Sequence, residues 1–367
     1  MVHTLAQTRQ QGSLRRRAEA PSGTIAGRPW SSASQRFNIA TASAAVGAGA
    51  GSRGRCRMKA STRGLAAVLG AALCAGIGVS AVGGLALLAK PAQAAVGVHA
   101  EEIVRFPSVD GDLTGGAPTM LNGRLLRPAG NGPHPAVVML HGCGGLYTRN
   151  GRVSPRHVWW ATHLQRQGYE VLMVDSFGPR DVEEVCTTAL KDRTVRATVE
   201  RKRDAWAALA FLRKRPEVDH ERIGLIGWSQ GAGTVMAAYG AGEDGPAGTE
   251  EGGFRAAVAF YPGCKSALSN EDWQPDGPLL LLVGGKDDWT PPETCVELSG
   301  RDGVKGKVDL VVYPDAYHGF DSPDAPVRKR KNLATAPGGT AHVGTDEDAR
   351  SDAIRRVNEF FKEKLGG

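Results

Sequence analysis

The sequence predicts a single α/β domain in which a mostly parallel, doubly wound sheet is flanked by helices. Apolar runs of strand length recur from residue 136 onward and alternate with helical stretches, which is the pattern of α/β folds. These runs are nearly continuous, so both faces of each strand are expected to be buried, as in parallel sheets. A chain of 367 residues, 41% of them hydrophobic, can bury a full core.

The elements follow from these runs in chain order. Strands are predicted at residues 136–140, 170–175, 222–228, 255–261, 278–284 and 307–313. Helices are predicted at 158–167, 194–215, 231–239 and about 348–365. The segment MLNGRLLRP, residues 120–128, is expected to add a hairpin strand at the sheet edge. Two polar insertions, 242–253 and 321–340, are predicted to be loops.

The first 94 residues differ in composition from the rest of the chain. They contain 12 Lys and Arg residues against one acidic residue, whereas residues 95–367 contain 33 against 37. The net charge of +7 therefore belongs to the leader. Because the remainder is mildly acidic and has no basic patch with interleaved aromatic residues, we expect no nucleic-acid partner.

The leader has two parts. Residues 1–57 are rich in Ser, Ala, Gly and Arg, which predicts a segment that is disordered or not translated at all. Residues 58–94 combine a basic start, an apolar run at 65–89 and an A-x-A site at 92–94, which is typical of a secretory signal peptide. The alternative is a retained membrane anchor, since the run is long enough to span a bilayer. We expect export to the periplasm or the medium, with residues 95–367 as the folded catalytic domain.

The segment GWSQG, residues 227–231, carries the strongest chemical signal. It follows a predicted strand and precedes a predicted helix, which is the context of a nucleophile elbow. Side chains at Gly227 and Gly231 would collide with the neighbouring strand or helix in so tight a turn. The helix start also offers free N–H groups to a developing oxyanion. Ser229 is therefore the predicted nucleophile, and the alternative is a serine that only caps the helix.

A serine needs a base and an acid, and both follow in order. Asp287 lies in GKDDWTP, just after the strand at 278–284, and His318 lies in YPDAYHGF, after the last predicted strand. The order Ser, Asp, His is that of α/β-hydrolases. Asp287 is preferred to Asp288 for its spacing to Gly284, and one of the two aspartates is expected to cap the helix near Pro292. The alternative for His318 is a surface or core-capping histidine.

The turn HGCGG, residues 141–145, follows the strand at 136–140. A glycine-rich turn in this place can direct the backbone N–H of Cys143 toward a substrate carbonyl oxygen, together with the N–H of Gln230. The alternative is a plain strand-to-helix turn. We expect no base to activate Cys143, so its backbone N–H and not its thiol is the group expected to act.

With the segment DSFGPR, residues 175–180, these motifs resemble the dienelactone hydrolase family over residues 115–366. The resemblance implies Ser229 as nucleophile, Asp287 as acid and His318 as base. The type enzymes have a cysteine nucleophile, a glutamate where this chain has Gly142, and two arginines that hold the substrate carboxylate. Arg180 resembles one of these arginines. Ser322 stands at the place of the other.

The implied function is hydrolysis of a carboxylic ester or lactone through an acyl-enzyme. Arg180, Trp289 and Tyr147 are candidates for substrate contact, and we expect no cofactor, a small-molecule substrate and a monomer. The alternatives are a peptidase, acyl-peptide hydrolase or thioesterase with the same triad, or a binding protein of the cell envelope that has no activity. A membrane contact is expected only if the run at 65–89 is retained.

Four cysteines lie outside the leader: Cys143, Cys186, Cys264 and Cys295. After export they could form two disulfides with three possible connectivities. We expect Cys143 with Cys186 and Cys264 with Cys295, because each pair would join two loops at the carboxyl side of the sheet. The alternative is four free thiols. None of the spacings is that of a zinc site, so no metal is expected.

Overall fold

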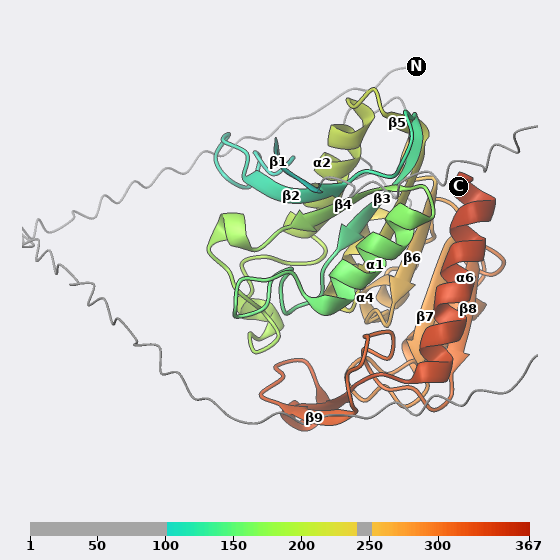
Figure 1. Ribbon diagram of the computed structural model, residues 1–367. Helices are drawn as coiled ribbons and strands as arrows, with labels where there is room; N and C mark the ends of the chain where they lie inside the picture. The colour runs from blue at the N-terminus through green and yellow to red at the C-terminus, as the bar shows by residue number, and fades with distance from the viewer. Residues whose placement is uncertain (1–100, 241–251) are drawn as a thin grey trace, which may run out of the picture. The chain divides into compact units, whose positions relative to one another are not determined.

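The computed structural model describes residues 101–240 and 252–367 (Figure 1). The predicted leader, the predicted signal peptide or anchor, and residues 242–251 of the first polar insertion lie outside the described residues. Within the described ranges, no helix is long and apolar enough to cross a membrane.

An eight-stranded sheet forms the centre of the domain, in the order β1-β2-β4-β3-β5-β6-β7-β8. The pairs from β4 across to β8 are all parallel, and β2 pairs antiparallel with both β1 and β4. The strands are β1 Glu101–Pro107, β2 Met120–Leu126, β3 His134–Leu140, β4 Glu170–Asp175, β5 Val218–Trp228, β6 Ala256–Phe260, β7 Leu279–Gly284 and β8 Val308–Tyr313. Every residue of β4, β6 and β7 is buried, as expected for strands covered on both faces.

All six predicted parallel strands are present, and two predictions about the remaining strands are wrong. The predicted edge strand, β2, lies inside the sheet, because β1 pairs along its whole length and forms the edge. The insertion 321–340, predicted to be a loop, contains β9 Arg328–Lys331, which pairs antiparallel with β10 Thr340–Val343. Four consecutive basic residues gave no alternating apolar pattern by which β9 could be recognised.

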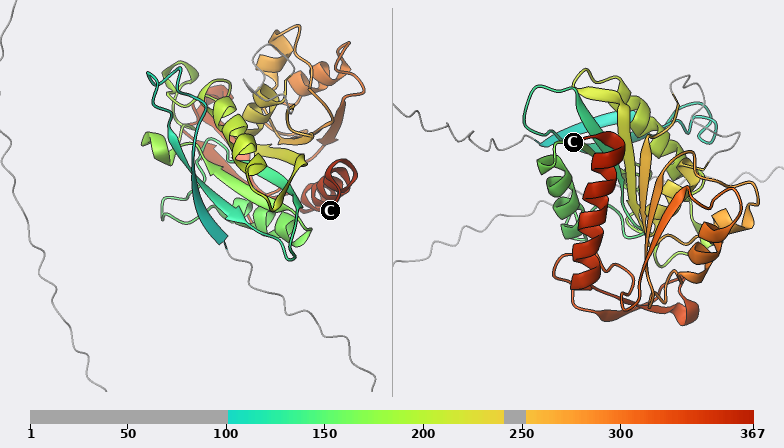
Figure 2. Two further views of the ribbon diagram at one scale, coloured as in Figure 1. Left: turned by 90° about the horizontal axis from the view of Figure 1, so that it is seen from above. Right: turned by 90° about the vertical axis from the view of Figure 1, so that its right-hand side faces the viewer.

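Helices cover both faces of the sheet (Figure 2). α1 Pro155–Arg166 and α6 Glu347–Leu365 pack on one face. On the other face lie α2 Glu200–Arg213, α3 Gln230–Ala238, α4 Lys265–Ser269 and α5 Glu293–Gly300. Short 3₁₀ turns occur at Gly178–Arg180, Leu190–Asp192 and Pro337–Gly339. The four predicted helices are present, although α2 starts at Glu200 and not at residue 194.

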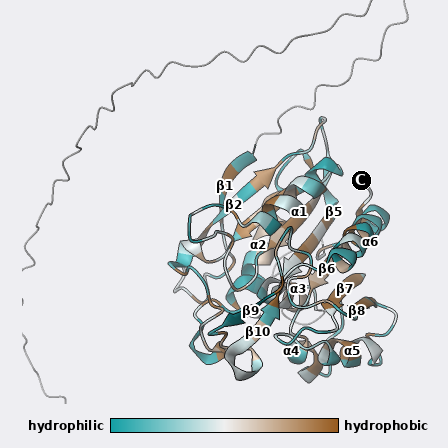
Figure 3. Ribbon diagram, turned by 60° about the horizontal axis from the view of Figure 1, so that its bottom comes forward, coloured by the Kyte–Doolittle hydropathy of each residue, from teal (hydrophilic) through white to brown (hydrophobic). Residues whose placement is uncertain are grey.

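A hydrophobic core lies on each face of the sheet, between the strands and the helices. Hydrophobic residues concentrate in the strands (Figure 3). One core joins Trp160 of α1 and Phe361 of α6 to the sheet, and the other joins Leu209 of α2 and Val235 of α3. Full burial of such side chains contributes roughly 1.5–3 kcal/mol each. The rigid sheet fixes the carboxyl ends of its strands, and in folds of this class the ligand site lies there.

Candidate active site

Ser229 lies on a strained turn between β5 and α3. Its φ of 54° and ψ of −117° are a conformation that residues other than glycine rarely adopt. A Cβ on Gly227 would lie 2.5 Å from the carbonyl oxygen of Gly231, and a Cβ on Gly231 would overlap the carbonyl oxygen of Leu140. Both glycines are thus required by close approach. The hydroxyl of Ser229 makes no capping hydrogen bond to α3, although Ser229 occupies the N-cap position.

Three side chains from three strand ends form one hydrogen-bonded series. Oγ of Ser229 lies 3.0 Å from Nε2 of His318, and Nδ1 of His318 lies 2.8 Å from Oδ2 of Asp287. His318 and Asp287 are both buried. Because a carboxylate accepts the bond at Nδ1, Nε2 is free to take the serine proton. The series therefore has the geometry of a nucleophile, a base and an orienting acid.

Asp287 is kept ionised by its surroundings. Burial alone would raise the pKa of this carboxyl group. The charge and hydrogen bond of His318, with backbone N–H bonds from Thr290 and Trp289, outweigh burial and lower the pKa below its ordinary value. Those two N–H groups each lie 2.9 Å from Oδ1. The expected capping of the helix near Pro292 is wrong, since α5 has no side-chain cap and Asp287 instead closes the turn before it.

Aromatic rings and a buried acid hold the histidine and the serine turn in place. The rings of Tyr261 and Trp289 lie 4.5 and 4.6 Å from the imidazole of His318, centroid to centroid. The Tyr261 hydroxyl donates to Asp321 at 2.5 Å, and the indole N–H of Trp228, next to Ser229, donates to the same carboxylate at 2.7 Å. Sequence reasoning missed Asp321. The one signal for Asp321 in the sequence was its position three residues after the candidate base His318.

The turn at 141–145 faces the nucleophile from the end of β3. In the described part of the chain, the backbone N–H of Cys143 donates to no other residue. Gln230 is the first residue of α3, where a backbone N–H has no partner within the helix. Both N–H groups are thus available to a substrate oxygen.

Both expected disulfides are present. Cys143 is bonded to Cys186, with a Cα–Cα distance of 5.0 Å, and Cys264 is bonded to Cys295, with a distance of 5.1 Å. The backbone N–H of Val185 also donates to the carbonyl of Cys143 at 2.8 Å. The first disulfide thus fixes the turn at 141–145, and the second ties the loop after β6 to α5.

A cavity of about 270 Å³ opens over Ser229 and His318. The turn at 142–145 forms one part of its wall, together with Cys186, and the β9–β10 hairpin contributes Arg328, Arg330 and Val343. Its other polar and aromatic residues are Tyr147, Thr148, Ser154, Arg156, His157, Trp289 and Ser322. Tyr147 and Trp289, both candidates from the sequence, therefore line the cavity.

Comparison with known proteins shows to which family this chain belongs. The model of the dienelactone hydrolase family matches residues 121–365, which is most of the chain. The chain belongs to the dienelactone hydrolase family. It is 33% identical over 135 residues to the thiohydrolase aneE of Aspergillus aculeatus, a match that covers 37% of this chain and only 36% of that protein.

Solved structures agree on the fold. A putative dienelactone hydrolase from Klebsiella pneumoniae matches with a TM-score of 0.50 and 18% identity, over 72% of this chain and 99% of that one. A dienelactone hydrolase-like promiscuous phosphotriesterase from metagenomic libraries matches with a TM-score of 0.50 and 21% identity, over 73% of this chain and 100% of that one. At these identities the likeness supports an α/β-hydrolase fold and indicates no particular substrate.

The structure does not bring Arg180 to the cavity of this dienelactone hydrolase family member. Its guanidinium lies 2.8 Å from the carboxylates of both Asp110 and Asp204, so its charge is neutralised by ion pairs within the protein. Arg156 reaches the cavity instead and donates to the hydroxyl of Ser322, at the place where the type enzymes are expected to have their second arginine.

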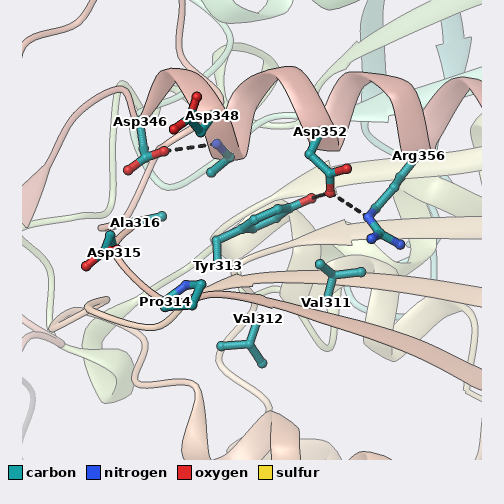
Figure 4. Close-up of a pocket in the computed structure, with 11 residues that line it drawn as sticks. Val311, Val312, Tyr313, Pro314, Asp315, Ala316, Asp346, Asp348, Asp352 and Arg356 are labelled. Carbon is teal, nitrogen blue, oxygen red and sulfur yellow. Dashed lines mark hydrogen bonds and ion pairs between the residues drawn. The ribbon is translucent and has the colours of Figure 1, made fainter.

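A second cavity, of about 430 Å³, lies between the end of β8 and the start of α6 (Figure 4). Its carboxylates are largely engaged: Asp352 binds Tyr313 and Arg356, and Asp346 accepts from the backbone N–H of Ala349. No serine, cysteine or histidine lines it, so it contains no series of the kind formed by Ser229 and His318. Within residues 101–240 and 252–367, no group of three or more His, Cys, Asp or Glu side chains is arranged to bind a metal ion.

Proposed function

We propose that this dienelactone hydrolase family member is a serine hydrolase that cleaves a carboxylic ester or lactone through an acyl-enzyme. The observation that carries the proposal is the series from Ser229 through His318 to Asp287, with a serine hydroxyl 3.0 Å from an imidazole nitrogen at the floor of a cavity. The strained backbone of Ser229 supports it, because strain of this kind is concentrated at functional residues.

In the proposed reaction, Nε2 of His318 takes the proton of Ser229 while Oγ forms a bond to the ester carbonyl carbon. The carbonyl oxygen becomes an oxyanion and accepts hydrogen bonds from the N–H groups of Cys143 and Gln230. His318 then gives its proton to the leaving alcohol as the ester bond breaks. A water molecule, deprotonated by His318, then attacks the acyl carbon; the bond to Oγ of Ser229 breaks, His318 returns the proton to Oγ, and the acid is released. Asp287 orients the imidazole and stabilises its cation throughout.

A thioester is the second candidate substrate class. The observation that favours it is the partial similarity to a protein named as a thiohydrolase. The same triad and oxyanion hole would act on a thioester, with a thiol as leaving group. Because the match covers about a third of either protein, the oxygen ester remains the main proposal.

The two disulfides support a further part of the proposal, that the protein is exported and meets a small-molecule substrate in an oxidising compartment.

The proposal is tested by labelling the purified protein with a fluorophosphonate probe and assaying chromogenic esters, thioesters and peptides. We expect stoichiometric labelling at Ser229 and turnover of esters. A protein that only binds ligands would not be labelled. Preference for peptides over esters would identify a peptidase, and labelling at another residue would contradict the assignment of the nucleophile.

A further inference from the structure

Arg201, in α2, is a fully buried cation to which the proposed reaction gives no role. A buried charge is costly unless it is bonded. Arg201 forms no ion pair with a described carboxylate, and the nearby carboxylate of Asp204 is bound by Arg180. Instead, Nη2 of Arg201 donates to the carbonyl oxygen of His141 at 2.7 Å, and Nη1 donates to Oε1 of Gln230 at 3.1 Å. Its bonds go to uncharged acceptors, so its positive charge is only partly compensated.

These two acceptors belong to the two segments that carry the proposed oxyanion donors. His141 begins the turn that presents Cys143, and Gln230 directly follows Ser229. The segments lie against each other, since a Cβ on Gly231 would be 2.5 Å from the carbonyl oxygen of His141. A guanidinium group has a rigid, planar set of donors. One such group bonded to both segments therefore fixes the distance between them.

The side chain of His141 extends this hydrogen-bond network to Gly142, the residue before Cys143. The backbone N–H of Ser176 donates to Nε2 of His141 at 3.3 Å, so the ring proton lies on Nδ1, which donates to the carbonyl oxygen of Gly142 at 2.8 Å. Burial, followed by the charge of Arg201, lowers the pKa of His141 well below its usual range. His141 is thus a neutral link whose hydrogen bond closes the turn.

Arg201 itself stays charged at neutral pH. Burial lowers its pKa to about 10, against the favourable charge of Asp204. Its guanidinium lies over the ring of Phe177, 5.2 Å from the centroid, which adds a cation–π contact. The side chain is therefore both fixed in place and protonated.

We propose that Arg201 is a positioning residue of the oxyanion hole, which braces the backbone N–H groups of Cys143 and Gln230 and adds a buried positive charge behind them. The inference rests on the proposed function. A charge and donors that act on a developing oxyanion stabilise the transition state more than the bound ester. Loss of Arg201 should therefore lower kcat and leave KM nearly unchanged.

The test uses Arg201→Met and Arg201→Lys in the full protein. We expect Arg201→Met to lower kcat by about tenfold to a hundredfold, with KM within about twofold of the wild-type value. Its affinity for a trifluoromethyl ketone, whose adduct with Ser229 carries an oxyanion, should fall by about the same factor. Arg201→Lys keeps the charge and should recover part of kcat.

Arg213→Met is the matched control. Arg213 is a second buried arginine of α2, and it donates to the backbone carbonyls of Gly252 and Gly253, outside the cavity. This variant should lower the melting temperature without a comparable loss of kcat. If Arg201→Met does not fold, Gln230→Ala removes one acceptor and should lower kcat by about tenfold.

Two results would overturn the inference: a kcat for the folded variants within about threefold of wild type, or the same loss of kcat in Arg213→Met as in Arg201→Met. In either case the wild-type protein still hydrolyses esters and is labelled at Ser229. Failure of the proposed function looks different, because then the wild-type protein itself hydrolyses no ester.

Discussion

Asp288 accepts a hydrogen bond from Nδ1 of His342 at 2.8 Å, so the two adjacent aspartates of GKDDWTP have different partners. Asp287 is bonded to His318, whereas Asp288 also accepts from the backbone N–H of His342 and thereby holds β10 against the loop after β7. Asp288 is a support of the hairpin that covers the cavity.

Asp287→Asn is therefore expected to be far more damaging than Asp288→Asn. The first change removes the charge that fixes the imidazole tautomer and should lower kcat about a thousandfold or more. The second leaves the series from Ser229 to His318 intact and should lower kcat by less than about tenfold. Steady-state kinetics of the two purified variants decide this. A greater loss in Asp288→Asn would show that the acid has been assigned to the wrong residue.

Ser229→Ala and Ser229→Gly separate the chemical role of the serine from its strain. Both should abolish ester turnover, because the nucleophile is gone. Alanine keeps the strained φ of 54°, so its melting temperature should match wild type. Glycine tolerates this conformation and should raise the free energy of unfolding by about 1 kcal/mol. More than a few per cent residual turnover in Ser229→Ala would contradict the nucleophile assignment.

The two disulfides should differ in their effect on activity. Cys186→Ser frees the turn that presents Cys143, whereas Cys295→Ser frees a link outside the oxyanion hole. Each closes a loop of tens of residues, so each loss should cost about 2–4 kcal/mol of stability. Only Cys186→Ser should also lower kcat markedly at a temperature where both variants are folded. Peptide mapping of the purified protein without reductant checks the pairing, and recovery of four free thiols would refute it.

Glu170, at the start of β4, should make stability depend on pH. It is fully buried, neither carboxylate oxygen has a hydrogen-bond partner, and Arg215 lies 3.4 Å away. Burial raises its pKa to about 7, although the charge of Arg215 acts in the opposite direction. The folded state therefore binds this proton more tightly than the unfolded chain, and stability falls as pH rises from about 4.5 to about 7.

Glu170→Gln removes this dependence. The variant should melt higher than wild type at pH 8 and close to it near pH 4.5, since Arg215 keeps its partners Glu102 and Glu217. Thermal unfolding of both proteins across this range is the measurement. A melting-temperature difference that does not change with pH would contradict the assignment.

Arg328 and Arg330 should select for negatively charged esters. They line the cavity, whose lining includes no Asp or Glu, and neither forms an ion pair with a described residue. Side chains alternate along a strand, and Lys329 and Lys331 of the same strand do not line the cavity. Changing both arginines to Gln should lower kcat/KM for an ester that carries a carboxylate by about tenfold, and leave a neutral ester unaffected. The matched control is the Lys329→Gln, Lys331→Gln variant, which should behave as wild type with both esters.

The sequence by itself determined the parallel sheet, the elbow and the order of the candidate triad. These features depend on local properties: continuous apolar runs, the glycines at Gly227 and Gly231, and short motifs at strand ends that a parallel sheet must bring to one edge. The expected disulfide pairing followed from the same edge, because each proposed pair joins segments on that side of the sheet.

Only the tertiary structure decided the roles of the charged residues. Arg180 was expected to contact substrate, but its guanidinium forms ion pairs with Asp110 and Asp204. Asp110 lies between β1 and β2 and Asp204 lies in α2, so both are distant from Arg180 in the sequence. Arg201 had no signal in the sequence, since its partners lie 60 and 29 residues away. A hydrogen bond or ion pair depends on distances of a few ångströms between elements, and these are set by packing, which local sequence patterns do not encode.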